Sequence, residues 1–355
     1  MKTMRIGVIG AWGHLGAVLE QIEMMPGVEI SGLAGVFPED AYGQIQQTYS
    51  KAAQAKVHGT YQEMLRLNRP DIVVIGTRLD QISVAACAAA EAGCHLICEK
   101  PLAIELSALA DLWAAVQAHS VECITMLANG DRPAIRTAAE IVRKGVLGSV
   151  AVVNVRKSYR WGERPAWFGR RDLYGGTIPW IGIHALDMLW QVTGKEVLRV
   201  AAWQGNMAHP ELPQCQDHAA MLLELVDGGM ATITVDFLRP AGAPTHGDDW
   251  IRVVGSCGQI EAYLDRGPGG VCHAMVGSEA GKDEELLEEG HVFQGFIEAI
   301  SVGKAAGLRA DTARAFRTTY LSLQSRAAAE ERGIRQIDDR YSPAWVKRTS
   351  KPISR

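Results

Sequence analysis

A charged pair follows directly after a short apolar segment in the first third of the chain. Residues 95–98 predict a buried strand, which ends at Glu99, Lys100 and Pro101. In a parallel sheet, ligands collect outside the carboxyl ends of the strands. Lys100 therefore brings an ammonium group to a place where chemistry usually occurs, beside a carboxylate and on a backbone that Pro101 stiffens. The alternative is a solvated ion pair at the start of a loop, and this short motif alone does not separate the two.

A histidine and an aspartate form a second candidate pair. The apolar spacing over 180–190 predicts a helix, and His184 and Asp187 lie three residues apart on one face near its N-terminal end. A lone histidine in a helix is more often a core residue than a catalyst. Gly175-Gly176 upstream and the carboxylate one turn later make His184 a functional candidate.

The densest cluster of aromatic and polar side chains lies over 159–176. Aromatic faces can stack on the apolar faces of sugars, and arginine can bond hydroxyls or carboxylates. The candidate substrate-binding residues of this segment are Tyr159, Arg160, Trp161, Arg164 and Trp167. The alternative is an aromatic-rich loop that packs a domain interface.

A glycine-rich turn begins at Gly10. It follows a β-branched apolar run over 4–9, has the spacing G-x-x-G-x-x-G through Gly13 and Gly16, and precedes an amphipathic stretch that ends at residue 25. Strand, glycine turn and helix in this order predict a dinucleotide site, because the backbone and the helix N-terminus can approach a pyrophosphate. The alternative is a tight turn with no ligand. The candidate cofactor contacts are Gly10, Trp12, Gly13, His14, Leu15, Thr77, Glu99 and Lys100.

The sequence leaves the choice between NAD and NADP open. The second predicted strand, 28–34, ends at Gly35, where a site for NAD normally has an acidic residue for the ribose hydroxyls. Glu39 and Asp40 come later, and we expect them to begin a helix over 40–55. No lysine or arginine stands there for a 2′-phosphate.

Strands and helices alternate through the first part of the chain. Helices are predicted over 61–67, 81–92, 105–119 and 133–143, and further strands over 71–76 and 121–127. This alternation predicts an α/β domain with a doubly wound parallel sheet.

From residue 149 the strands become longer and follow one another without helices. They are predicted over 150–156, 197–205, 218–225, 230–238 and 250–254, with a hairpin at 227–229. This pattern predicts an α+β domain with an open, mostly antiparallel sheet. We expect a cofactor domain over 1–128, a substrate domain over 129–340 and a polar tail over 341–355. Helices are expected over 292–301 and 311–331, and the second of these could pack back on the first domain.

The composition excludes several kinds of partner. The 355 residues are 47% hydrophobic and 21% charged, with a net charge of −4, so the chain has no basic surplus for nucleic acid. No apolar run approaches the roughly 18 residues that span a bilayer, and the N-terminus lacks a secretory signal. The seven cysteines form no C-x-x-C pair. We therefore expect no metal site and a cytoplasmic location.

These elements together resemble the glucose–fructose oxidoreductase/inositol dehydrogenase (Gfo/Idh/MocA) family. The matching segments span about residues 1–330 in order; they are the glycine turn, Glu99-Lys100-Pro101, 143–148, Gly175-Gly176, His184 with Asp187, and 254–261. The resemblance implies a Rossmann domain that binds NAD or NADP. It also implies a second domain whose open sheet supplies the substrate pocket and the interface of a homodimer or homotetramer.

The resemblance also implies roles for the candidate residues. Lys100 would lie near the nicotinamide and the substrate hydroxyl, and would act as acid or base where burial or a nearby positive charge favours its neutral form. His184 would bond the same hydroxyl or relay its proton. Glu99 would orient Lys100 or the cofactor, and Lys100-Pro101 could be a cis bond. The family pattern has aspartate four residues before the histidine, where this chain has Trp180.

The function implied is hydride transfer between a nicotinamide cofactor and a secondary alcohol or ketone. The substrate would be a sugar, a cyclitol or a sugar-like acid, with Trp180, His184 and Asp187 among its contacts. Two alternatives stay open. Trp180 and Gly35 favour a dinucleotide sensor without catalysis, although such a sensor would need neither Lys100 nor His184. A lyase or glycosidase that uses transient oxidation would need the same lysine.

Overall fold

The computed structural model describes residues 3–342, and these divide into two compact units. Unit 1 comprises 3–126, 172–175 and 291–319, and unit 2 comprises 127–171, 176–290 and 320–342. The predicted polar tail spans 341–355, and its residues after 342 lie outside the described part of the chain. Within 3–342, no helix has both the length and the apolar character needed to cross a membrane.

Unit 1 contains a six-stranded parallel sheet with the order β3-β2-β1-β4-β5-β6. Its strands are β1 (Met4–Ile9), β2 (Val28–Ala34), β3 (Val57–His58), β4 (Ile72–Ile75), β5 (His95–Cys98) and β6 (Cys123–Thr125). The strand order reverses between β1 and β4, and such a reversal opens a crevice at the carboxyl ends of both strands. The predicted parallel sheet is confirmed, and the candidate cofactor residues follow β1, β4 and β5.

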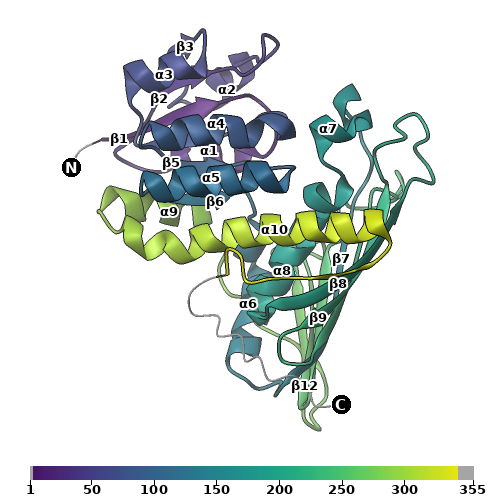
Figure 1. Cartoon of the computed structure of the whole chain (residues 1–355). Coiled ribbons are helices and arrows are strands. Elements are labelled where there is room, and N and C mark those ends of the chain that lie inside the picture. The colour runs from purple at the N-terminus through teal and green to yellow at the C-terminus, as the bar shows by residue number, and fades with distance from the viewer. Residues whose placement is uncertain (1–2, 343–355) are drawn as a thin grey trace. The chain divides into compact units, whose positions relative to one another are not determined.

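The strands of unit 1 are covered by helices, and α4 and α5 run side by side (Figure 1). The helices are α1 (Leu15–Glu23), α2 (Gly43–Thr48), α3 (Tyr61–Asn68), α4 (Leu79–Glu91), α5 (Leu106–Ala118) and α9 (Val292–Ser301). All four residues of β4 are buried, because helices on both faces leave a parallel strand no contact with water.

The prediction of one helix over 40–55 is wrong except for the six residues of α2. The Asp40 carboxylate accepts hydrogen bonds from the backbone N–H groups of Val36 (2.7 Å) and Phe37 (2.9 Å), so the segment after β2 is a closed loop. A side chain that bonds nearby backbone groups competes with helix formation. Asp40 therefore holds this loop and does not begin a helix.

Unit 2 contains a nine-stranded sheet with the order β14-β13-β12-β11-β7-β10-β9-β8-β15. Its strands are β7 (Val150–Ser158), β8 (Val197–Gly205), β9 (His218–Leu225), β10 (Met230–Asp236), β11 (Trp250–Gly255), β12 (Gly258–Tyr263), β13 (Val271–Val276), β14 (Lys282–Asp283) and β15 (Ile334–Gln336). All neighbouring strands are antiparallel except β7 and β10. The mostly antiparallel sheet and the hairpin at 227–229 are confirmed; Gly228 there has φ +89°.

One face of the unit 2 sheet is covered by α6 (Pro133–Arg143) and α8 (Ile183–Thr193), which also contact each other (Figure 1). Along β9 and β10 successive side chains alternate between buried and exposed, so the other face of these strands is open. The remaining short elements are η1 (Asn129–Asp131), η2 (Ala166–Gly169), α7 (Arg171–Tyr174), η3 (Ile178–Gly182) and η4 (Ala305–Leu308), and the long helix α10 runs over Arg309–Glu331.

Candidate active site

The glycine turn after β1 packs tightly against the residues that follow β4 and β5. Gly10 and Gly13 have φ +80° and +86°, which L side chains rarely adopt. A Cβ atom on Gly10 would collide with the backbone of Gly76, and one on Gly13 would collide with Glu99 Oε2. Trp12 N donates to Gly76 O (2.9 Å). The turn thus has the close backbone approach and the positive φ angles that a glycine turn after the first strand requires.

Glu99 anchors this turn. Its side chain is fully buried, and its carboxylate accepts hydrogen bonds from the backbone N–H and Nδ1 (2.9 Å) of His14 and from the N–H of Lys100 (3.1 Å). Burial would raise the pKa of Glu99, but the contacts with His14 and the charge of Lys100 lower it below its ordinary value. Glu99 is therefore an ionised group that fixes His14 at the start of α1.

This buried carboxylate predicts a pH-dependent stability. Because the folded pKa of Glu99 lies below its ordinary value of 4.5, its ionisation stabilises the fold above that pH, and the contribution is lost as the pH falls through the folded pKa. We expect Glu99→Gln to be less stable than the wild type at pH 7, and we expect this difference to shrink below pH 4.5. Thermal unfolding between pH 7 and pH 3 measures it. Glu20→Gln, on the exposed side of α1, is the control. A difference that stays constant with pH would contradict this assignment.

Lys100 is 1% exposed and lies directly after β5. The Lys100–Pro101 peptide bond is cis, as the resemblance implied. After this bond the chain is held by a hydrogen bond from Leu102 N to Thr319 Oγ1 (3.3 Å). The amine of Lys100 thus comes from a fixed backbone segment at the carboxyl edge of the sheet.

Thr77 gives the clearest sign that a ligand completes this edge. It follows β4, is 1% exposed, and its hydroxyl bonds to no other group among residues 3–342. Its Cβ lies close to Gly10, and Leu15, the first residue of α1, packs against Gly76. Buried hydroxyls are nearly always hydrogen-bonded. The positive-φ turn, the N-terminus of α1 and this hydroxyl fit the phosphate and ribose groups of a dinucleotide.

In unit 2, His184 and Asp187 lie one turn apart in the first half of α8. His184 is 8% exposed and Asp187 is 1% exposed. The helix is preceded by η3, a π-helical turn, and such turns are frequent at functional sites. Trp180 lies in this turn, is buried, and packs edge-on against Phe168, with 6.0 Å between ring centroids. The residue at the family's aspartate position is thus a core aromatic.

The aromatic cluster after β7 centres on Phe237. The rings of Tyr159 and Trp161 lie edge-on to it, at 4.9 and 5.3 Å, and the Arg164 guanidinium lies 4.6 Å from its centroid. Arg160 instead bonds the backbone oxygen of Ala243. Trp167 packs on Phe168 at 4.5 Å and borders this group only through Phe168, whose ring centroid lies 5.3 Å from the Arg164 guanidinium. The structure therefore brings together Tyr159, Trp161 and Arg164 of the five predicted residues.

The sequence did not reveal the group that supports Trp161. The Trp161 ring stacks on His209 (3.6 Å, 15°), and the fully buried Asp217 accepts bonds from His209 Nδ1 (3.1 Å) and His218 Nδ1 (2.7 Å). Burial would raise the pKa of Asp217, but the Ala208 backbone N–H and these donors lower it. The only sequence signal was an adjacent Asp-His pair at the start of a strand.

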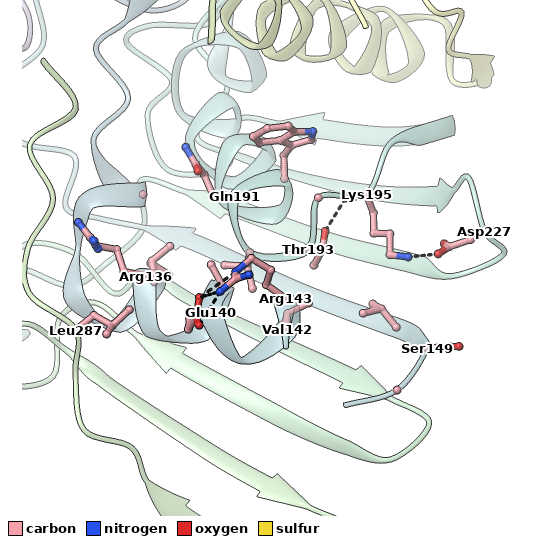
Figure 2. A pocket seen from close by; sticks show the side chains of 18 residues that line it. Arg136, Glu140, Val142, Arg143, Ser149, Gln191, Thr193, Lys195, Asp227 and Leu287 are labelled. Carbon is pink, nitrogen blue, oxygen red and sulfur yellow. Dashed lines mark hydrogen bonds and ion pairs between the residues drawn. The ribbon is translucent and has the colours of Figure 1, made fainter. Parts of the chain in front are cut away.

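A groove of about 770 Å³ lies elsewhere in unit 2 (Figure 2). It is formed by α6, the C-terminal end of α8 and Asp227, whereas His184 lies at the other end of α8. Two pairs of its charged groups form ion pairs: Arg143 with Glu140 (2.7 Å) and Lys195 with Asp227. It contains none of the candidate residues, so we do not assign it to the active site.

Two family models match the chain. The model of the oxidoreductase family with an NAD-binding Rossmann fold matches residues 4–126, and that of the GFO/IDH/MocA C-terminal domain matches residues 135–261. Together they match most of the chain, with residues in both units.

Several known proteins are similar to the chain. A solved structure from Thermotoga maritima, described as an oxidoreductase, is 30% identical with a TM-score of 0.85, over 94% of this chain and 100% of that one. Myo-inositol 2-dehydrogenase from Thermotoga maritima is 26% identical over 263 residues, 73% of this chain and 75% of the relative. The rhizopine catabolism protein MocA from Rhizobium meliloti is 23% identical over 274 residues, 76% of this chain and 81% of the relative.

Proposed function

Because the chain belongs to the Gfo/Idh/MocA family of oxidoreductases, we propose that it moves a hydride between NAD(P) and a secondary alcohol or ketone. The substrate class proposed is a sugar, a cyclitol or a sugar-like acid. The observation that carries this proposal is a buried lysine amine after β5, on the same sheet edge as the glycine turn and the unbonded Thr77 hydroxyl. The similarity to a myo-inositol 2-dehydrogenase supports the substrate class.

The cofactor contacts proposed are the turn and the strand ends around it: Gly10, Trp12, Gly13, His14, Leu15, Thr77 and Glu99. Bound NAD(P) supplies the ring that accepts or returns the hydride. Backbone N–H groups at the N-terminus of α1 would bind the pyrophosphate, since those of Gly10, Trp12 and His14 already donate within the fold, and the Thr77 hydroxyl would bond a ribose or phosphate oxygen. Glu99 contributes indirectly, because it holds His14 and hence the turn.

Lys100 is the proposed acid–base group. As a neutral amine it accepts the proton of the substrate hydroxyl while a hydride leaves the carbon that bears this hydroxyl, so the alcohol becomes a ketone. In the reverse direction the ammonium returns the proton to the oxygen. His184 bonds this hydroxyl or relays its proton, as in the family pattern. Since Trp180 carries no carboxylate, Lys100 and His184 perform the proton transfer without the aspartate of that pattern.

The substrate contacts proposed in unit 2 are Tyr159, Arg160, Trp161, Arg164, Trp167, Trp180, His184 and Asp187. The stacked pair of Trp161 and His209 supports a role in binding, because Asp217 holds the His209 ring and so fixes the orientation of the indole. A fixed aromatic face can pack on the apolar C–H face of a sugar ring.

We also propose that the protein is a cytoplasmic homodimer or homotetramer, assembled through the open face of the unit 2 sheet. The register aligns Leu222, Ala201 and Ile334 across β9, β8 and β15, and Leu222 and Ile334 are 48% and 70% exposed. Exposed apolar side chains in a row mark protein interfaces. Light scattering of the purified protein tests this; a monomer would contradict it.

Replacement of His184 tests whether this residue acts in the proton transfer and not in cofactor binding. We expect His184→Asn to lower kcat by about 100-fold, because proton transfer to a positioned side chain contributes 10²–10⁴-fold, and to leave the Kd for NADH within about twofold. His273→Asn is the control, since His273 lies on β13 and pairs with Asp283. Steady-state kinetics and a fluorescence titration measure the two effects. An unchanged kcat in His184→Asn would contradict the assigned role.

A substrate panel tests the proposed function itself. Purified protein is titrated with NADH and NADPH, and tryptophan fluorescence reports binding. It is then mixed with NAD⁺ or NADP⁺ and a series of cyclitols, aldoses and sugar acids, and the nicotinamide absorbance is followed. Formation of reduced cofactor with one of these classes supports the proposal. Tight cofactor binding without turnover of any compound would instead favour a dinucleotide sensor.

A further inference from the structure

The loop after β2 brings an acidic side chain back to the end of that strand. Gly35 follows β2, and a Cβ atom placed on it would lie 3.1 Å from Asp40 Cβ and 3.2 Å from Asp40 Oδ2. The carboxylate of Asp40 therefore lies directly beside the place where a side chain at position 35 would begin. The hydrogen bonds from Val36 N and Phe37 N to Oδ2 hold it there.

This place is next to the glycine turn. Gly10 N donates to Ala34 O (2.9 Å), which ties the turn to the end of β2. Tyr42, two residues after Asp40, is 5% exposed, and its pKa is raised first by burial and then by the charge of Asp40. The backbone of Gly10 also faces the Tyr42 hydroxyl and has the opposite effect, since it lowers the pKa of Tyr42. Asp40, Tyr42 and Gly10 are thus neighbours at the carboxyl ends of β1 and β2.

A cation that contacts this loop is already paired. Arg78 lies over the Phe37 ring, 4.4 Å from its centroid, and its Nε and Nη2 bond Asp80 Oδ1 (2.5 Å) and Oδ2 (2.9 Å). The pKa of Arg78 is raised, chiefly by the hydrogen bonds to Asp80, and the charge of Glu39 adds to this. A 2′-phosphate at this edge would therefore meet the carboxylate of Asp40 and an arginine whose charge Asp80 already compensates.

We propose that Asp40 selects NAD(H) over NADP(H), by accepting hydrogen bonds from the adenosine ribose hydroxyls and by repelling a 2′-phosphate. Asp40 Oδ1 bonds to no other group among residues 3–342, so it is open to a ribose hydroxyl while Oδ2 holds the loop. A carboxylate beside the second strand is the group that dinucleotide sites use for this purpose. Here a residue five positions later in the sequence provides it. The inference rests on the proposed function only in that a nicotinamide dinucleotide binds at the glycine turn.

The test compares NADH and NADPH on wild type, Asp40→Asn and Glu39→Gln by fluorescence titration. Wild type should bind NADH at least about tenfold more tightly than NADPH. Asp40→Asn keeps an oxygen for the amides of Val36 and Phe37 but removes the charge. Its NADH affinity should fall about tenfold, the loss expected when a charged hydrogen bond is removed, while its NADPH affinity should not fall. Glu39 is exposed and is the matched control, so Glu39→Gln should change both affinities by less than about twofold.

The outcomes separate the inference from the proposed function. Wild type that prefers NADPH, or an unchanged ratio of affinities in Asp40→Asn, would overturn the assignment of Asp40 and leave the proposed function intact. Wild type that binds neither cofactor would overturn both. Circular dichroism and thermal unfolding of each variant establish that it folds, so that a lost preference is not a lost structure.

Discussion

Lys100→Met is expected to lower kcat by about 10³-fold while the Kd for the reduced cofactor stays within about threefold. Methionine has a similar length and is readily buried, but it cannot accept or return a proton. The side chain is 1% exposed, and bulk water has little access to replace the amine as a base. General acid–base catalysis by one positioned group contributes 10²–10⁴-fold, so most of the rate should be lost.

The control for this variant is Lys56→Met, which removes an exposed lysine next to β3 and should leave kcat unchanged. Thermal unfolding of Lys100→Met shows whether the loss of the charge beside Glu99 affects the fold. Full activity in a folded Lys100→Met protein would remove Lys100 from the mechanism.

Gly13→Ala is expected to weaken cofactor binding by at least about 100-fold. The positive φ of Gly13 costs an alanine about 1–2 kcal/mol, and its Cβ would also collide with Glu99 Oε2. Relieving the collision moves the carboxylate that holds His14, which costs a charged hydrogen bond of about 1.5–3 kcal/mol. The turn then loses the conformation that receives the pyrophosphate.

Gly27→Ala provides the matched control. Gly27 has φ +71°, but a Cβ atom there would meet nothing within 4 Å, so only the backbone strain is common to both variants. Calorimetric or fluorescence titration with NADH should give a wild-type Kd for Gly27→Ala. Equal binding by the Gly13 and Gly27 variants would show that the contact with Glu99 does not shape the cofactor site.

The elements that were predicted correctly are those whose sequence signals are local. The turn at Gly10 and Gly13, the strand that ends before Lys100 and the hairpin at 227–229 each depend on glycines or apolar runs within about ten residues. Such signals need no knowledge of distant contacts. The same holds for the change from alternating strands and helices to consecutive strands after residue 149.

The features that were missed depend on side-chain contacts. Asp40 was expected to start a helix, but its bonds to Val36 N and Phe37 N close a loop instead. His209 and Asp217 lie about 50 residues from Trp161 in the sequence, and only the folded sheet brings them together. Periodicity cannot reveal either arrangement, because each is fixed by the geometry of a few polar atoms and not by an apolar pattern.

Transfer of a labelled hydride tests the central claim most directly. A cyclitol or sugar that the panel identifies as a substrate is prepared with deuterium on the carbon of its reacting hydroxyl, and the cofactor is analysed by mass spectrometry after a single turnover. Hydride transfer predicts that the deuterium appears in the nicotinamide ring with wild type and not, in the same time, with Lys100→Met. Product formation with the deuterium lost to water, or equal transfer by the Lys100→Met variant, would contradict the account.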